Sequence, residues 1–274
     1  NLLGAVAKGV TLGTFHAVCA RILRIDGEAI GVPRTFVIFD DSDQMATMKK
    51  VCAEFSLEPR QYPPRAILSV ISKAKSELKT AEGFGRGTGT YFEEIVARCY
   101  TRYQQLLVEN NALDFDDILM ETVDLLRQAP DVAEKLRDRY EHVMVDEFQD
   151  TNVAQYVLAR LLAPPPNANI CVVGDPDQSI YSCRSADIRN ILTFERAYPI
   201  ANIVILEQNY RSTQTILDSA TKIIESNKQR KKKELWTERG KGDPIVVYEA
   251  YNEEEEAMFV AREAKRLQRT IGLH

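Results

Sequence analysis

The stretch "HVMVDEFQDT", residues 142–151, is the best guide to the fold, because it begins with an apolar run and continues directly with carboxylates. The apolar part is typical of a buried strand, and Asp146, Glu147 and Asp150 follow it directly. The same order recurs in "NICVVGDPDQS" and "NIVILEQNYRS", which predicts further strands over 169–173 and 202–206. Three polar clusters therefore follow three predicted strands.

Each apolar run is followed by a segment with helical periodicity. In "NVAQYVLARLLA" the apolar residues fall on one face, and the helix is expected to end at prolines 164–166. "SADIRNILTFERAYP" and "STQTILDSATKIIESN" predict two more helices. Strands that alternate with amphipathic helices indicate a parallel sheet covered on both faces. Ligands bind at the carboxyl ends of such strands, so the three polar clusters hold the candidate functional residues.

The region 34–112 has a different pattern. Helices are predicted in "DSDQMATMKKVCAEF", "PPRAILSVISKAKSEL" and "YFEEIVARCYTRYQQLLVENN", separated by prolines 63–64 and a loop "GFGRGTGT". The simplest layout is an all-helical insertion between two parts of an α/β domain. Further along, "IVVYEAY" predicts a strand and "EEEEAMFVAREAKRLQ" predicts a charged helix.

Composition limits the function classes. The chain has 274 residues, 45% of them hydrophobic, a net charge of −5 and a pI near 5.5, so a DNA partner would need a local basic patch. Five cysteines and three histidines show no metal-ligand spacing. Neither a signal peptide nor a bilayer-spanning run is apparent, so we expect a cytoplasmic protein. The first residue is not Met, and we expect a piece of a longer protein.

Two interpretations of the first cluster are open from the residues alone. Carboxylates at a strand-to-helix turn can cap the following helix. Alternatively, one carboxylate holds Mg²⁺ beside nucleotide phosphates while its neighbour activates water, and alternation along the strand points the two side chains in different directions. In the second cluster Gly174 permits a tight exit from the strand, and Gln178 is able to contact a γ-phosphate.

Together the clusters resemble a known family. "VDEFQDTN", "VGDPDQSIYSCRSAD" and "LEQNYRS" resemble motifs II, III and IV of superfamily-1 DNA helicases of the UvrD, PcrA and Rep group. "GTFHAVCARILR" resembles the TFH motif that contacts DNA, and "LDFDDIL" resembles the segment that re-enters the first motor domain. The resemblance runs through nearly the whole chain.

The resemblance implies an α/β fold with a RecA-like P-loop NTPase parallel sheet, an inserted all-helical subdomain and the start of a second RecA-like domain. Residues 1–33 and 113–206 would belong to the first motor domain, with the helical insertion at 34–112. Residues 207–274 would begin the second motor domain.

The resemblance also implies roles at the nucleotide. Asp146 would be the Mg²⁺ carboxylate and Glu147 the residue that activates water. Gln178 would lie at the γ-phosphate, with Asp175 beside the nucleotide, and Arg184 would couple the ATP state to the structure. ATP and Mg²⁺ are the expected cofactors.

Further implied roles concern the second motor domain and DNA. Arg211 would stabilise charge on the transferring phosphoryl group, and Tyr210 would stack on adenine. The residues expected to contact single-stranded DNA are Thr14, Phe15, His16 and Tyr181.

Two departures from the family limit these expectations. Cys183 stands where the family usually has a tryptophan, which predicts a weaker or relocated grip on DNA. The chain also contains no G-x-x-x-x-G-K-[ST] sequence, and "GRGTGT" lacks the lysine and the following helix. We therefore predict that this chain alone hydrolyses ATP negligibly.

Three further charged runs have competing interpretations. Lys228 and the basic residues 230–233 either contact phosphates or form a solvated loop. The acids at 40, 41 and 43, and those at 114, 116 and 117, superficially resemble metal clusters. Capping of the helices that follow accounts for both acidic groups better.

The sequence thus predicts a fragment of an ATP-dependent 3′-5′ DNA helicase or translocase that acts on single-stranded DNA and ss/ds junctions in replication or repair. One alternative is a helicase-like motor within a recombination nuclease complex. Others are a metal-dependent phosphodiesterase that uses Asp146, Glu147 and Asp175 directly, or a non-catalytic DNA- or protein-binding remnant. Pathway, protein partners and oligomeric state are left open.

Overall fold

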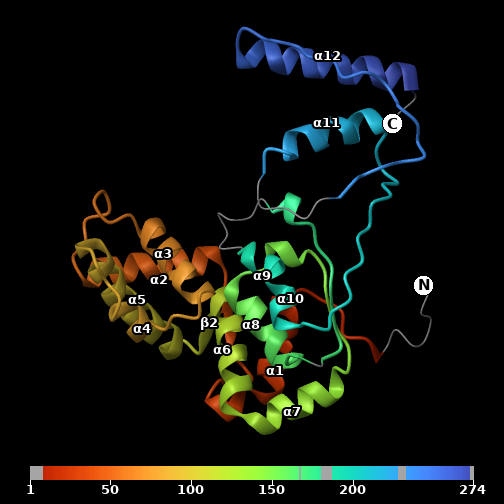
Figure 1. Ribbon diagram of the computed structural model, residues 1–274. Coiled ribbons are helices and arrows are strands. Elements are labelled where there is room, and N and C mark those ends of the chain that lie inside the picture. The colour runs from red at the N-terminus through yellow and green to blue at the C-terminus, as the bar shows by residue number, and fades with distance from the viewer. Residues whose placement is uncertain (1–8, 167, 180–186, 228–232, 272–274) are drawn as a thin grey trace. The chain divides into compact units, whose positions relative to one another are not determined.

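The computed structural model describes residues 9–166, 168–179, 187–227 and 233–271 (Figure 1). The chain divides into two compact units, 1–202 and 203–274. Within the described ranges, no helix has both the length and the apolar character needed to cross a membrane.

The first unit contains short strands among many helices. The α-helices are α1 (Phe15–Asp26), α2 (Asp41–Glu54), α3 (Pro64–Ser76), α4 (Ala81–Gly85), α5 (Tyr91–Glu109), α6 (Phe115–Gln128), α7 (Pro130–Arg139), α8 (Val153–Leu162), α9 (Arg189–Leu192) and α10 (Phe194–Ala197). The strands are β1 (Val37–Phe39), β2 (Ala112–Asp114), β3 (Val143–Val145) and β4 (Ile170–Val172), and the 3-10 turns are η2 (Gly27–Ile30), η3 (Phe148–Asp150) and η4 (Pro176–Gln178).

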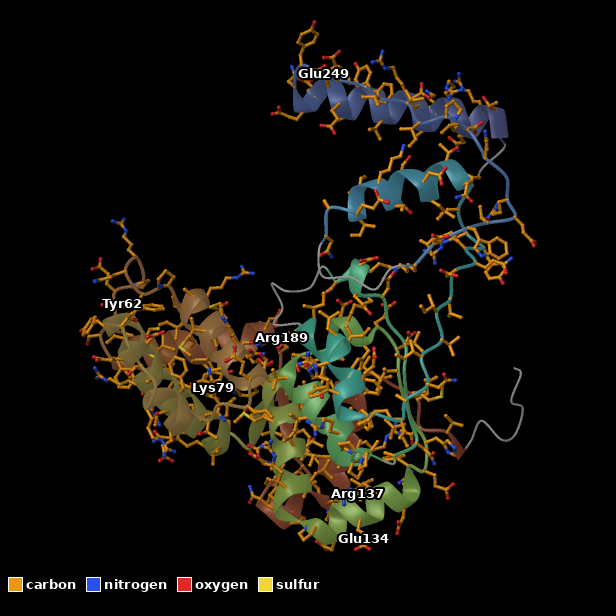
Figure 2. All side chains as sticks on the ribbon, viewed as in Figure 1. Tyr62, Lys79, Glu134, Arg137, Arg189 and Glu249 are labelled. Atoms are coloured by element: carbon orange, nitrogen blue, oxygen red, sulfur yellow. The ribbon has the colours of Figure 1, made fainter. Side chains whose placement is uncertain are left out.

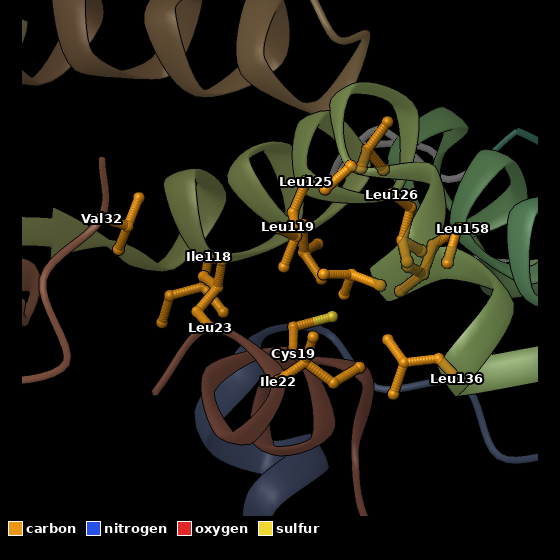
Figure 3. Packing of buried hydrophobic residues seen from close by; sticks show 14 of the residues in the cluster. Cys19, Ile22, Leu23, Val32, Ile118, Leu119, Leu125, Leu126, Leu136 and Leu158 are labelled. Carbon is orange, nitrogen blue, oxygen red and sulfur yellow. The ribbon is translucent and has the colours of Figure 1, made fainter. Parts of the chain in front are cut away.

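Helix α6 is at the centre of the first hydrophobic core. Its apolar residues recur at helical spacing, so that Ile118, Leu119 and Leu126 face inward together. Cys19 and Leu23 of α1 pack against them and are fully buried (Figure 3). Helices α7 and α8 complete this core, and Arg137 Nε of α7 donates to the carbonyl of Leu161 in α8 at 2.9 Å.

Helices α2, α3 and α5 form a second core of their own. Met48, Ile67 and Tyr103 are fully buried there, and Pro64 begins α3 at the position where a missing N–H costs nothing. Strand β1 precedes this group along the chain and β2 follows it, and the two strands pair in parallel with Val37 opposite Ala112. The chain therefore leaves one strand, passes through 40–111 as a helical excursion, and returns on the neighbouring strand (Figure 1).

The segment 83–90 is only partly the predicted loop. Residues 83–85 belong to α4, so the loop prediction is wrong over those positions. The Thr80 hydroxyl accepts from the Gly83 N–H at 3.0 Å, and this cap stabilises the first turn of a short helix despite its two glycines.

Strands β3 and β4 pair in parallel, with Val143 opposite Ile170 and Val145 opposite Val172. Phe148, Phe194 and Tyr198 form the core beneath them, with Phe194 stacked on Tyr198. The predicted strands at these two positions are confirmed, as is the helix that follows the first of them, α8.

Two predictions about the later segments are wrong. "SADIRNILTFERAYP" was expected to form one helix, but its described part forms α9 and α10, separated at Thr193. The Thr193 hydroxyl donates to the Arg189 carbonyl at 2.6 Å, a contact that bends helices. Residues 202–206 are not a strand, because no segment in the described part of the chain pairs with them.

The second unit contains α11 (Gln214–Ile224) and α12 (Glu253–Ile271). Both helices were predicted, and α12 begins with four glutamates and has arginine in its last turn. The strand expected over 245–251 does not form: in the described part of this unit the recorded pairing is one isolated bridge, Gln208 with Trp236. Val204 and Val247 are consequently exposed.

Candidate active site

The loops that follow β3 and β4 lie side by side. Val173 N donates to Val145 O at 2.8 Å, and Phe148 N donates to Val173 O at 2.9 Å, so hydrogen bonding continues past the strands into the loops. Asp146 and Glu147 are exposed at this edge, whereas Val145 and Phe148 on either side are buried. The parallel pair thus places two of the predicted polar clusters together.

Glu147 adopts the left-handed conformation, with φ 50° and ψ 42°. Its N–H donates to Asp146 Oδ1 at 2.9 Å. The two side chains therefore separate through a tight turn rather than through the strand alternation that the sequence suggested. Few residues other than glycine adopt this conformation, and it is a form of backbone strain found at functional sites.

The β4 loop is organised by Asp175. Its Oδ1 accepts from Asp177 N at 3.0 Å, which caps η4. Its Oδ2 accepts from the Gln178 side-chain amide at 2.8 Å. Gln178 is exposed, so its amide is held in place at the surface, where it is able to contact a ligand.

Gln149 is a site residue that the sequence did not single out. Its side chain is buried between the two loops and donates to Glu147 Oε2 at 2.7 Å. Its Oε1 accepts from the Asp175 N–H at 3.0 Å. The sequence gives no signal that Gln149 connects the two loops, because its partner Asp175 follows 26 residues later.

The carboxylates fit Mg²⁺ only as part of a nucleotide complex. Hard carboxylate oxygens suit this ion, and Asp150 Oδ1 is buried with no hydrogen-bond partner among the residues that the structure describes. Burial and the nearby charge of Glu147 raise the pKa of Asp150. No cluster of three or more metal-ligating side chains occurs in the described residues, so phosphate oxygens and water would complete the coordination, as is usual for Mg²⁺.

The predicted DNA-contacting residues at the start of α1 are partly used by the fold. Thr14 caps α1, with its hydroxyl accepting from Ala17 N at 3.3 Å. Phe15 packs against the cores, and His16 makes an edge contact with Phe115 at 5.9 Å between ring centroids. Burial lowers the pKa of His16. Three other predicted positions, Tyr181, Cys183 and Arg184, lie outside the described residues.

Tyr210 and Arg211 form a separate group in the second unit. Both are exposed, and Tyr210 donates its hydroxyl to Gln208 Oε1 at 2.7 Å. Asn209 Oδ1 accepts from the Arg211 N–H at 2.9 Å, which fixes the turn before α11. Arg239 Nη1 donates to the Arg211 carbonyl at 2.8 Å. The sequence did not single out Asn209 or Arg239.

One cavity in the described structure lies elsewhere. It has a volume of about 380 Å³ and lies against the exposed side of β3 and β4, where its lining includes His142, Met144, Cys171 and Ile200. Its lining contains none of the predicted nucleotide residues. The candidate site at the ends of β3 and β4 is therefore separate from this cavity.

Comparison with known proteins agrees with these motifs. Residues 1–199 match the UvrD/REP helicase N-terminal domain, and residues 204–273 match the UvrD-like helicase C-terminal domain. The chain is 47% identical to the ATP-dependent DNA helicase PcrA of Leuconostoc citreum over 97% of its length, 46% identical to that of Staphylococcus aureus and 45% identical to that of Bacillus subtilis.

The matched segment is part of each relative. The chain spans 35% of the Leuconostoc citreum protein, 37% of the Staphylococcus aureus protein and 36% of the Bacillus subtilis protein. A family model covering most of the chain, three motifs in order and the parallel β3–β4 edge all agree. This chain belongs to the UvrD/REP helicase family, whose domains have a RecA-like α/β fold.

Proposed function

We propose that the chain supplies the central part of an ATP-dependent DNA motor that moves 3′ to 5′ on single-stranded DNA and unwinds ss/ds junctions. The observation that carries the proposal is the juxtaposition of two clusters. Parallel pairing of β3 with β4 brings the loop of Asp146 and Glu147 beside the loop of Asp175 and Gln178. The curated relatives are named ATP-dependent DNA helicases.

Each side chain has a chemical part in this proposal. Asp146 binds Mg²⁺, which when present neutralises charge on the nucleotide phosphates. Glu147 orients and deprotonates the attacking water, and its exposure at the loop leaves that water room to approach. Gln178, held by Asp175, contacts the γ-phosphate and reports whether it is present.

Tyr210 and Arg211 act from the second unit. Tyr210 stacks on adenine with its exposed ring, and the Arg211 guanidinium stabilises charge on the transferring phosphoryl group. Arg184, outside the described residues, couples nucleotide state to structure. The turn at Asn209 supports the roles of Tyr210 and Arg211, because it fixes the backbone from which these two side chains extend.

On the DNA side, Thr14, Phe15 and His16 at the start of α1 face the single-stranded backbone, and Tyr181 meets a base. Thr14 caps the Ala17 N–H, and the other N–H groups at the start of α1 support this assignment, since N–H groups in a first turn favour an anion. Closure of the two motor domains on ATP would then move one relative to the other along the strand, and hydrolysis would reopen them.

We also propose a domain layout, which the separate cores support. We assign 1–33 and 113–206 to the first RecA-like motor domain, 34–112 to an inserted helical subdomain, and 207–274 to the start of the second motor domain. Helices α2, α3 and α5 have a core of their own, and they lie in the chain between the paired strands β1 and β2. Both observations support the inserted subdomain.

The test compares the full-length parent protein with this chain alone. With ATP and Mg²⁺, the parent should hydrolyse ATP faster when single-stranded DNA is added, and should displace a strand from a duplex with a 3′ tail. This chain, which has no G-x-x-x-x-G-K-[ST] sequence, should hydrolyse negligibly. DNA cleavage that needs Mg²⁺ but not ATP would instead favour the phosphodiesterase alternative.

A further inference from the structure

Gln149 lies in the turn between β3 and α8, and its side chain is 1% exposed. The nitrogen of its side-chain amide faces hydrogen-bond acceptors, and the oxygen faces a donor. Nε2 donates to carboxylates, at 2.7 Å to Glu147 Oε2 and at 3.3 Å to Asp150 Oδ2. Oε1 accepts from the Asp175 backbone N–H at 3.0 Å. Only this orientation of the amide satisfies both ends, since a carboxylate cannot donate and an N–H cannot accept.

Gly174 leaves the space in which Gln149 lies. A Cβ at position 174 would be 2.5 Å from Gln149 Oε1 and 3.1 Å from the Phe148 backbone N. The first distance is too short for any contact, so a larger residue would displace the amide. The glycine after β4 therefore serves close approach of the two loops, and not merely a tight exit from the strand.

Glu147 depends on this contact for its direction. Its backbone is left-handed and its side chain is exposed, so packing does not restrict the carboxylate. In the described structure, the side-chain hydrogen bond recorded for this carboxylate is the one from Gln149. Without it, rotamers that point away from the site become accessible.

A continuous path of hydrogen bonds joins the two candidate nucleotide groups. Glu147 accepts from Gln149, Gln149 accepts from the Asp175 N–H, and Asp175 accepts from the Gln178 amide. A shift of Gln178 on loss of a phosphate would reach Glu147 through three short contacts. Hydrogen-bond networks of this kind are among the structures that carry energetic coupling between two sites.

We propose that Gln149 is the positioning residue of this site: its buried amide holds the Glu147 carboxylate in its water-activating orientation and ties that orientation to the loop carrying Asp175 and Gln178. The proposal rests on the proposed ATP hydrolysis. Gln149 itself contacts no reacting atom, and it acts through Glu147.

The test uses substitutions that separate the two ends of the amide. Gln149→Glu retains an acceptor for the Asp175 N–H but replaces the donor to Glu147 with a second carboxylate. Gln149→Leu removes both contacts. Gln155→Glu is the matched control, because the Gln155 Oε1 accepts from Asn152 N in the α8 capping box, a contact that glutamate also makes.

In the full-length parent, both Gln149 variants should lower kcat for DNA-stimulated ATP hydrolysis about 10- to 100-fold, the scale expected when a catalytic group is misplaced. KM for ATP and affinity for single-stranded DNA should change less than about twofold in Gln149→Glu, since this variant keeps the β4 loop in place. Gln155→Glu should match the wild type in all three quantities.

A second readout is independent of catalysis. Amide hydrogen exchange in residues 173–178 of this chain should rise in Gln149→Leu, which loses the acceptor for Asp175 N–H, and stay unchanged in Gln149→Glu. A wild-type kcat in Gln149→Glu, with the variant folded, would overturn the positioning role. An inactive wild-type parent would instead refute the proposed function, while the exchange result would still decide whether the bridge exists.

Discussion

Two strand ends in this molecule have similar sequences and opposite environments. "ALDFDD", residues 112–117, and "VMVDEFQD", residues 143–150, each place acids at the end of a three-residue strand of a parallel pair. Asp114 and Asp117 are buried and each lies 2.7 Å from Lys75 Nζ. Asp146 and Glu147 are exposed, and no ion pair to either is found among the described residues. Burial decides which acids are structural and which remain available to a ligand.

The buried acids form an ionic cluster that links three helices. Lys75 comes from α3, Tyr103 of α5 donates its hydroxyl to Asp114 at 3.1 Å, and Gln104 donates to Asp117 at 3.2 Å. Burial raises the pKa of Asp117 to about 7. Burial also opposes ionisation of Asp114, but the charge and hydrogen bond of Lys75 hold the pKa of that carboxyl below its usual value. The capping prediction for these acids is confirmed, but it missed the lysine.

The largest expected effect is at the exposed end. Glu147→Gln in the full-length parent should lower kcat about 10²- to 10⁴-fold, the usual contribution of a general base. The unfolding midpoint of the chain should not change, since Glu147 is exposed. Glu141→Gln, another exposed glutamate just before β3, is the control for loss of charge. An ATP hydrolysis rate in Glu147→Gln above one-tenth of the wild-type rate would contradict the base assignment.

At the buried end the effect should fall on stability. Lys75→Met leaves two buried carboxylates without their cation, and should lower the free energy of unfolding by about 3–5 kcal/mol. Lys79→Met is the matched control and should cost less than about 1 kcal/mol, because Lys79, which is labelled in Figure 2, forms an ion pair with Glu77 at the surface. Urea unfolding of the chain measures both. Equal effects would show that burial does not distinguish the two lysines.

The cluster should also make stability depend on pH. The pKa of Asp117 is higher in the folded chain than in the unfolded chain, so the folded state binds more protons. The contribution of Asp117 is therefore fully present below pH 3.8 and is lost as pH rises to about 7. Asp117→Asn removes this loss, and its stability relative to wild type should rise between pH 4 and pH 7. A constant difference across that range in urea unfolding would refute the assignment.

The smallest expected effect is on the free energy of unfolding when a helix cap without charge is removed. Asn152 caps α8 through a capping box, as Asp114 caps α6, but Asn152 carries no charge. Asn152→Ala should lower the free energy of unfolding by about 1 kcal/mol. Asn169→Ala, at an exposed position outside any helix, should change it by less than about 0.5 kcal/mol. A cost for Asn152→Ala as large as that of Lys75→Met would mean that caps, not the ion cluster, dominate.

Local pattern alone determined much of this protein. Local sequence patterns predicted α2, α3, α5, α8, α11 and α12, with apolar periodicity indicating α8 and α11 and the order of charges indicating α12. The polar ends of β3 and β4 marked the candidate site, and the order of the motifs indicated the family. These features depend on neighbours within a few residues, which a sequence displays directly. Residues 202–206 have the same apolar pattern as β3, but a strand also needs a hydrogen-bonded neighbour, and that is a tertiary property.

Only the tertiary structure decided the environments of the acids. Lys75 and Asp114 are 39 residues apart. Nothing local predicts that this lysine is buried among two aspartates and two tyrosines. Gln149 reaches Asp175 because β3 pairs with β4 and Gly174 leaves room for its amide. The charge of a side chain is written in the sequence, but its solvation and its partners depend on packing between distant segments, and these determine whether an acid holds the fold together or faces a ligand.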